Sequence, residues 1–174
     1  HTPSLSITTF RVSIRGVGRP NLAVGSEPGI GIYWDGVYNT ENGIFNYSEF
    51  MDIERIEVLR GPQGTLFGRN TPAGLVKFDS VKPSQQFDGF VSWSYGNKNT
   101  SDLRAAVGGG LTDSTSARVS LLRQHRDDYI DNKAPGFEDE NVLGGYTDRA
   151  ARIQFLYEGE RFDALFNYHM RDLD

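Results

Sequence analysis

The chain has 174 residues, a formal net charge of −5 at pH 7 and no cysteine. These properties exclude a disulfide framework and a cysteine-ligated metal, and an acidic chain lacks the basic surface typical of nucleic-acid-binding proteins. No stretch approaches about 18 uncharged apolar residues, which excludes a membrane helix. Membrane strands are not excluded, because each needs only about 10 residues with every second one apolar. The three histidines lack metal-ligand spacing, and no motif predicts nucleotide binding or catalysis, so we predict neither a cofactor nor an enzyme.

The composition shifts near Lys82-Pro83-Ser84, which predicts two parts, residues 1–82 and residues 83–174. In the first part, short apolar runs are separated by turn signals, as in a small α+β unit. Residues 30–34 predict a strand that enters a hairpin at Asp35-Gly36, because Asp-Gly is favoured where a type I′ turn requires positive φ.

Three further elements are expected in this first part. Residues 50–56 are compatible with one helical turn, and residues 56–60 predict a strand. The sequence Gly61-Pro62-Gln63-Gly64 closes that strand, since proline suits the second position of a turn. Residues 75–78 predict one more strand.

In the second part, the hydrophobic period changes to two, which predicts five consecutive amphipathic strands. The alternating segments are residues 87–95, 102–111, 117–124, 151–157 and 162–170. In a membrane barrel, one face of these strands would contact lipid through Val91, Trp93, Val107, Val119, Ile153, Phe155, Phe166 and Tyr168. In a soluble β-sandwich, the same side chains would form the buried core.

The connections between these strands favour the membrane alternative. Short turns at residues 113–114 and 159–160 fall on one side, and a long acidic connection over residues 126–145 falls on the other, which is the outer-membrane pattern. The connection at residues 97–99 is short where a longer external loop is usual. Alternation alone leaves a soluble extracellular β-rich binding or adhesive domain open.

A long motif in the first part goes further. Residues 52–71, with the sequence DIERIEVLRGPQGTLFGRNT, closely resemble the plug signature of TonB-dependent receptors. Three other pieces resemble plug motifs in the family's order: IRGVG at residues 14–18, IYWDGVY at 32–38, and AGLVKF at 73–78 followed by Lys82-Pro83. The resemblance extends over residues 10–131. Departures are Trp34, where the family often has valine, and Phe78-Asp79, where it often has Asn-Ile.

The resemblance implies a function and a location. The chain would be the later part of an α+β plug domain followed by antiparallel transmembrane β-barrel strands, with the barrel not closed. The whole receptor would lie in the bacterial outer membrane, contact its lipid, and import a scarce solute. A ferric siderophore is the favoured solute, with cobalamin, haem or a glycan as alternatives. The energising partner would be TonB, through an N-terminal box that we expect to be absent from this chain.

The resemblance also implies two sets of site residues. Plug side chains that could form charge-assisted contacts with the barrel wall are Arg15, Glu57, Arg60 and Arg69. The hairpin at Asp35-Gly36 would point its tip at the external vestibule, and binding sites favour such loops on rigid supports. The polar and aromatic residues that follow it are therefore candidates for solute binding: Asn39, Thr40, Glu41, Asn42, Asn46 and Tyr47.

Overall fold

The structure is a computed structural model that describes residues 13–18, 29–38, 51–68, 71–133 and 139–173. The chain folds into two compact units. The first unit ends at Val81, and the second continues from Lys82. Among the described residues, no helix is both long enough and apolar enough to cross a membrane.

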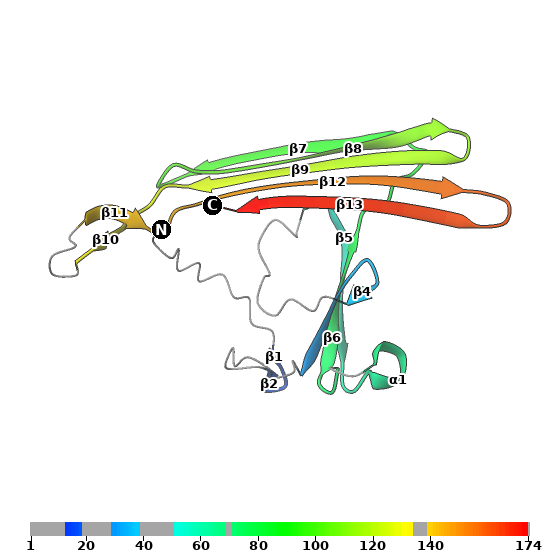
Figure 1. Cartoon of the computed structure of the whole chain (residues 1–174), viewed down its shortest axis with the longest axis horizontal. Helices are drawn as coiled ribbons and strands as arrows, with labels where there is room; N and C mark the ends of the chain where they lie inside the picture. The colour runs from blue at the N-terminus through cyan, green and yellow to red at the C-terminus, as the bar shows by residue number, and fades with distance from the viewer. Residues whose placement is uncertain (1–12, 19–28, 39–50, 69–70, 134–138, 174) are drawn as a thin grey trace. The chain divides into compact units, whose positions relative to one another are not determined.

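The first unit is built on a four-stranded mixed sheet with the order β4-β3-β6-β5. Its strands are β3 (Ile30–Trp34), β4 (Val37–Tyr38), β5 (Ile53–Arg60) and β6 (Gly74–Ser80). β3 runs parallel to β6, whereas β3–β4 and β5–β6 are antiparallel pairs (Figure 1). The predicted strands at residues 30–34, 56–60 and 75–78 are confirmed.

Two tight turns in this unit depend on positive backbone φ. Asp35 (φ 46°) and Gly36 (φ 83°) connect β3 to β4, as the Asp-Gly sequence predicts. Arg15 (φ 53°) and Gly16 (φ 80°) make the same connection between β1 (Ser13–Ile14) and β2 (Val17–Gly18). The β3–β4 hairpin was therefore predictable from its local sequence, whereas the β1–β2 hairpin was not predicted.

The helical turn expected over residues 50–56 is wrong in its described part. Ile53 already pairs with Ser80 of β6, and β5 continues to Arg60 with one register shift between Ile53 and Arg55. Pairing along the edge of β6 overrides a weak local preference for helix. The expected turn at residues 61–64 is followed directly by a short helix, α1 (Gly64–Phe67), which the sequence analysis did not predict.

A cluster of buried apolar side chains lies on one face of the first unit's sheet. Its buried members are Ile14, Ile30, Ala73, Val76 and Phe78, with Ile32, Trp34 and Ile53 packed against them. On the opposite face, the Tyr33 hydroxyl donates to the Phe67 carbonyl oxygen at 2.6 Å, which links the sheet to α1. Both faces of β3 are thus held by contacts distant in sequence.

The second unit is a five-stranded antiparallel meander with the order β13-β12-β9-β8-β7. Its strands are β7 (Asp88–Gly96), β8 (Thr100–Thr112), β9 (Thr115–Arg126), β12 (Tyr146–Glu158) and β13 (Asp163–Leu173). The five predicted strands are confirmed. β7 and β13 form the two edges of the sheet, which is not closed by the strands described (Figure 1).

The long connection between β9 and β12 contains a structured element. β10 (Ile130–Asn132) pairs with β11 (Asp139–Leu143) in an antiparallel hairpin beyond the ends of β9 and β12 (Figure 1). From the sequence, only a long acidic loop is expected over residues 126–145. The hairpin is not apparent in the sequence because β10 has only three residues.

Candidate functional site

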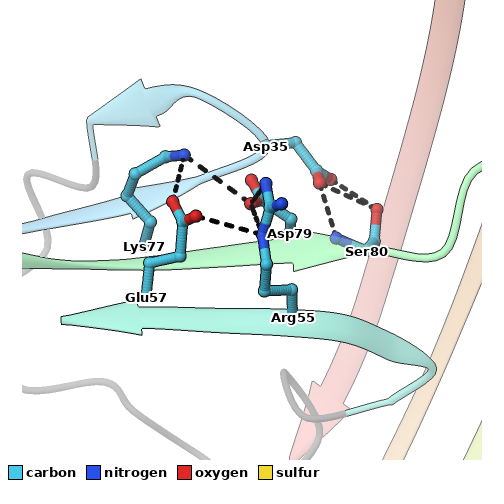
Figure 2. Close-up of polar contacts among 6 residues, drawn as sticks. All are labelled: Asp35, Arg55, Glu57, Lys77, Asp79 and Ser80. Carbon is cyan, nitrogen blue, oxygen red and sulfur yellow. Dashed lines mark hydrogen bonds and ion pairs between the residues drawn. The ribbon is translucent and has the colours of Figure 1, made fainter.

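The turn between β3 and β4 is tied to the end of β6 by a latch, which consists of the Asp35 carboxylate and Ser80. Asp35 accepts from two donors of Ser80: the backbone N–H at 2.8 Å, and the hydroxyl, whose Oγ lies 2.9 and 2.7 Å from the two carboxylate oxygens (Figure 2). The Asp35 N–H in turn donates to the Phe78 carbonyl oxygen at 2.9 Å. Ser80 is fully buried, so these bonds satisfy polar groups that water does not reach.

Four charged side chains form a closed ring on the same sheet, two from β5 and two from β6 (Figure 2). Lys77 Nζ lies 2.8 Å from a Glu57 oxygen and 3.6 Å from an Asp79 oxygen. Arg55 closes the ring, at 3.2 Å from Glu57 and 2.8 Å from Asp79. Each charge therefore contacts two opposite charges, and the ring as a whole is neutral.

The ring shifts the acid–base equilibria of its members. Burial works against ionisation of Asp79, but the Arg55 hydrogen bond and the Lys77 charge hold the pKa of its carboxyl below the usual value. The hydrogen bond to Glu57 raises the pKa of the Lys77 ammonium above its usual value, against a smaller opposing effect of burial. The charged forms of both residues are thus favoured in the folded first unit.

The residues that depart from the family pattern meet in this region. Trp34 and Phe78 are direct partners across β3 and β6, and their rings stack with centroids 4.5 Å apart and planes 16° apart. Asp79, the next departure along the chain, is the residue that binds Arg55 and Lys77. The three residues that depart from the family pattern, Trp34, Phe78 and Asp79, are therefore accommodated by contacts with one another or with neighbouring charged side chains.

The structure describes three of the candidate plug–barrel residues. Arg15 is exposed in the β1–β2 turn, and Arg60 is exposed at the end of β5. Glu57 belongs to the charged ring. Arg69 and the six solute-binding candidates lie outside the described residues: Asn39, Thr40, Glu41, Asn42, Asn46 and Tyr47. The roles assigned to both sets stay predictions.

One face of the five-stranded sheet is apolar and exposed. A row of paired residues crosses the sheet on this face: Val107, Val119, Ile153 and Tyr168. Their exposed fractions are 49%, 36%, 37% and 54%. The other four side chains expected on this face, Val91, Trp93, Phe155 and Phe166, are exposed as well.

The opposite face of the same sheet is mainly polar; it is buried on the inner strands β9 and β12 and largely exposed on the edge strands β7 and β13. Its buried polar side chains come from β9 and β12: Ser116, Arg118, Ser120, Gln124, Asp148, Arg152 and Gln154. Three arginine–carboxylate pairs lie on this face: Arg104 with Asp102 at 2.7 Å, Arg118 with Asp88 at 2.8 Å, and Arg171 with Asp148 at 2.9 Å. Gln124 also donates to Asp102 at 2.6 Å.

None of the residues in these polar pairs is among the site residues predicted from the sequence. Alternation alone assigns Asp102, Arg104 and Arg118 to the polar face. The sequence therefore indicated that these charged residues share a face, but it did not indicate which residue each of them pairs with. Asp88 and Arg118 are thirty positions apart, and only the strand register brings them together.

The chain matches known proteins in both of its parts. Residues 6–75 match the family described as TonB-dependent Receptor Plug Domain. The pesticin receptor of Yersinia enterocolitica is 28% identical over 135 residues, which cover 77% of this chain and 19% of the receptor. The ferrioxamine B receptor of Salmonella typhimurium is 38% identical over 77 residues, covering 43% of this chain and 11% of that receptor.

Two further relatives extend the comparison. The vitamin B12 transporter BtuB of Vibrio vulnificus is 29% identical over 112 residues, covering 59% of this chain and 18% of the transporter. The crystal structure of the ferric yersiniabactin uptake receptor FyuA from Yersinia pestis superposes with a TM-score of 0.78 at 22% identity, covering 98% of this chain and 26% of that chain.

The chain thus spans about a fifth or less of the length of the curated relatives described above. The matched plug segment, the mixed sheet that contains its motifs, and the antiparallel strands that follow have the order and fold of these receptors. Residues 6–75 thus belong to the TonB-dependent receptor plug family, and the fold of the chain is that of part of the TonB-dependent receptors of the bacterial outer membrane.

Proposed function

We propose that the receptor containing this chain imports a scarce solute across the outer membrane. In this proposal, the five strands β7, β8, β9, β12 and β13 belong to the barrel wall, with their apolar face toward lipid and their polar face toward the lumen. The observation that carries the proposal is the inverted distribution of side chains on the sheet. The row through Val107 and Ile153 is exposed, whereas Arg118 and Gln154 on the other face are buried.

A soluble β-sandwich requires the reverse distribution. Its apolar face packs against a second sheet, and its polar face meets water. An exposed apolar band is stable where the surrounding medium is hydrocarbon, which is the condition of a barrel wall. This argument weighs against the rival function, a soluble extracellular β-rich binding or adhesive domain.

We propose a ferric siderophore as the solute. Two similar proteins, the ferrioxamine B receptor and the ferric yersiniabactin uptake receptor, are named for such compounds. The similarity to a vitamin B12 transporter makes cobalamin the second candidate. Haem and glycans remain as classes that the experiment below also includes.

The plug supplies the proposed gate. Arg15, Arg60 and Arg69 are proposed to hold it to carboxylates of the barrel wall, because charge-assisted bonds are strong yet reversible. Glu57 has partners within the plug, so a wall contact would have to share it with Lys77. TonB is the proposed energising partner, and the proposed solute contacts are the six candidates after the β3–β4 hairpin.

The test is uptake by cells that carry or lack the gene for this receptor. We expect deletion to abolish accumulation of iron supplied as one ferric siderophore from a panel, with no change in iron supplied as citrate. Cobalamin, haem and glycan uptake are measured in the same strains. Loss of cobalamin uptake alone would replace the proposed solute, and recovery of the receptor in the soluble fraction would overturn the proposed function.

A second strain that lacks TonB serves as the matched control for energy supply. Uptake should be lost there as well, although the receptor remains in the outer membrane. Replacing Asn42, Asn46 and Tyr47 together by alanine tests the proposed solute contacts. An unchanged dissociation constant in this triple variant, with normal barrel assembly, would remove that segment from the site.

A further inference from the structure

The root of the β10–β11 hairpin contains a bulge. The β9–β12 pairing ends at Arg126 and Tyr146, and the hairpin pairing begins at Ile130 and Leu143. One strand therefore uses one residue more than the other between the two pairs, which makes the ladder bend. At this bend, Gly144 has a φ of 92°, a conformation that side-chain-bearing residues rarely adopt.

One arginine occupies the centre of this bend. The guanidinium carbon of Arg126 lies 4.9 Å from the centroid of the Tyr129 ring and 5.0 Å from that of Tyr146. Its Nε and Nη2 atoms donate to the Gly144 carbonyl oxygen at 3.1 and 2.7 Å. The same group thus makes two cation–π contacts and a forked hydrogen bond.

Further hydrogen bonds hold both sides of the bend. The Gly145 N–H donates to Asp128 Oδ1 at 2.7 Å, and the Tyr129 N–H donates to the Leu143 carbonyl oxygen at 3.0 Å. The backbones also approach closely here. A Cβ added at Gly145 would lie 2.7 Å from the Asp128 nitrogen, so a larger residue would force the strands apart.

The root is joined to the neighbouring turn as well. The Asp127 N–H donates to the Lys98 carbonyl oxygen in the turn between β7 and β8, at 2.9 Å. That turn is tight, with Lys98 and Asn99 both at positive φ. The hairpin is therefore connected at its base to both the β9–β12 pair and the β7–β8 pair.

From these contacts we infer that Arg126 is a positioning residue that holds the β10–β11 hairpin as a preordered arm at the end of β9 and β12. A planar guanidinium can lie against two rings while it donates two hydrogen bonds to one carbonyl. A lysine ammonium carries the same charge without the plane or the fork. Under the proposed function, the arm would stand at the external end of the barrel. This location is the only part of the inference that rests on the proposed function.

The test is hydrogen–deuterium exchange of the full-length receptor in detergent micelles. We expect Arg126→Ala and Arg126→Lys to speed exchange in peptides covering residues 127–133 and 143–145 by about tenfold or more, because the root opens locally. The matched control is Arg123→Ala, which removes an exposed arginine from the same strand and should leave these peptides unchanged. Exchange in β8 should stay as in the wild type in all variants.

A pair of variants at Tyr129 tests the clamp without altering the arginine. Tyr129→Phe keeps the ring and should retain the wild-type protection, whereas Tyr129→Ala should lose part of it. Wild-type exchange in Arg126→Ala would overturn the inference, and so would full protection in Arg126→Lys, since charge alone would then suffice. The assay does not involve transport, so either result leaves the proposed function to its own test.

Discussion

Substituting Val107 by arginine tests the orientation of the barrel strands most directly. Val107 lies near the middle of β8, which runs over Thr100–Thr112. It pairs with Val119 on β9, and Val119 pairs with Ile153 on β12, so its side chain lies within an apolar row. If this row faces lipid, an arginine at position 107 would have its charge close to the bilayer midplane.

The expected cost follows from that depth. An arginine on the lipid face costs about 2–4 kcal/mol at the midplane and about 0–1 kcal/mol near the interfaces. On the surface of a soluble sheet, the same change at a 49% exposed valine would stay within about 0.5 kcal/mol. The two orientations therefore predict effects that differ by more than the usual error of such measurements.

Position 101 provides the matched control. Ser101 lies on the same strand and face as Val107, but it pairs with Tyr95 and His125 at the end of the ladder. We expect Ser101→Arg to cost at most about 1 kcal/mol.

The assay is equilibrium unfolding of the full-length receptor in phospholipid vesicles, together with the yield of assembled receptor in the outer membrane. Equal free energies of unfolding for Val107→Arg, Ser101→Arg and the wild type would refute lipid exposure of this face. A wild-type assembly yield for Val107→Arg would argue the same way.

Three predictions concern the plug. Asp35→Ala should lower the free energy of unfolding by about 2–3 kcal/mol, because buried Ser80 loses this acceptor. Ser80→Ala should lower it by less than Asp35→Ala does. Equal urea midpoints for Asp35→Ala and the wild type would contradict a stabilising role of the latch. Gly74→Ala should lower the free energy of unfolding by about 2–4 kcal/mol, since φ is 136° and the new Cβ would clash with the Leu59 carbonyl oxygen. Gly64→Ala should be tolerated, because the space around Gly64 is open. Similar rates of proteolysis for the two variants would refute this reasoning. The pKa of Asp79 is lowered in the folded plug, so its contribution is complete above its unfolded pKa of about 3.9 and is lost as pH falls through the folded value. The free energy of unfolding of the wild type should accordingly fall more steeply with decreasing pH than that of Asp79→Asn, below a pH of about 4. Parallel curves of this free energy against pH for the two proteins would exclude the charged ring as the cause of the loss of stability in acid.

Local sequence was sufficient for the elements that depend on period and turn chemistry. The alternation after residue 83 predicts all five long strands, because one face of each strand differs in polarity from the other. The Asp35-Gly36 hairpin follows from the φ that those residues tolerate. The plug motif over residues 52–71 was long and ordered enough to identify the family.

Tertiary structure decided what local sequence could not. Residue Ile53 belongs to a strand because β6 offers a free edge to pair with, which no local window contains. The partners of Asp35, Arg118 and Arg126 were likewise set by strand register and by the bend at Gly144. Alternation states which side chains share a face, but a pair forms only when distant strands align. That alignment is a property of the folded sheet, and for this reason the latch, the polar pairs and the hairpin root became visible only in the structure.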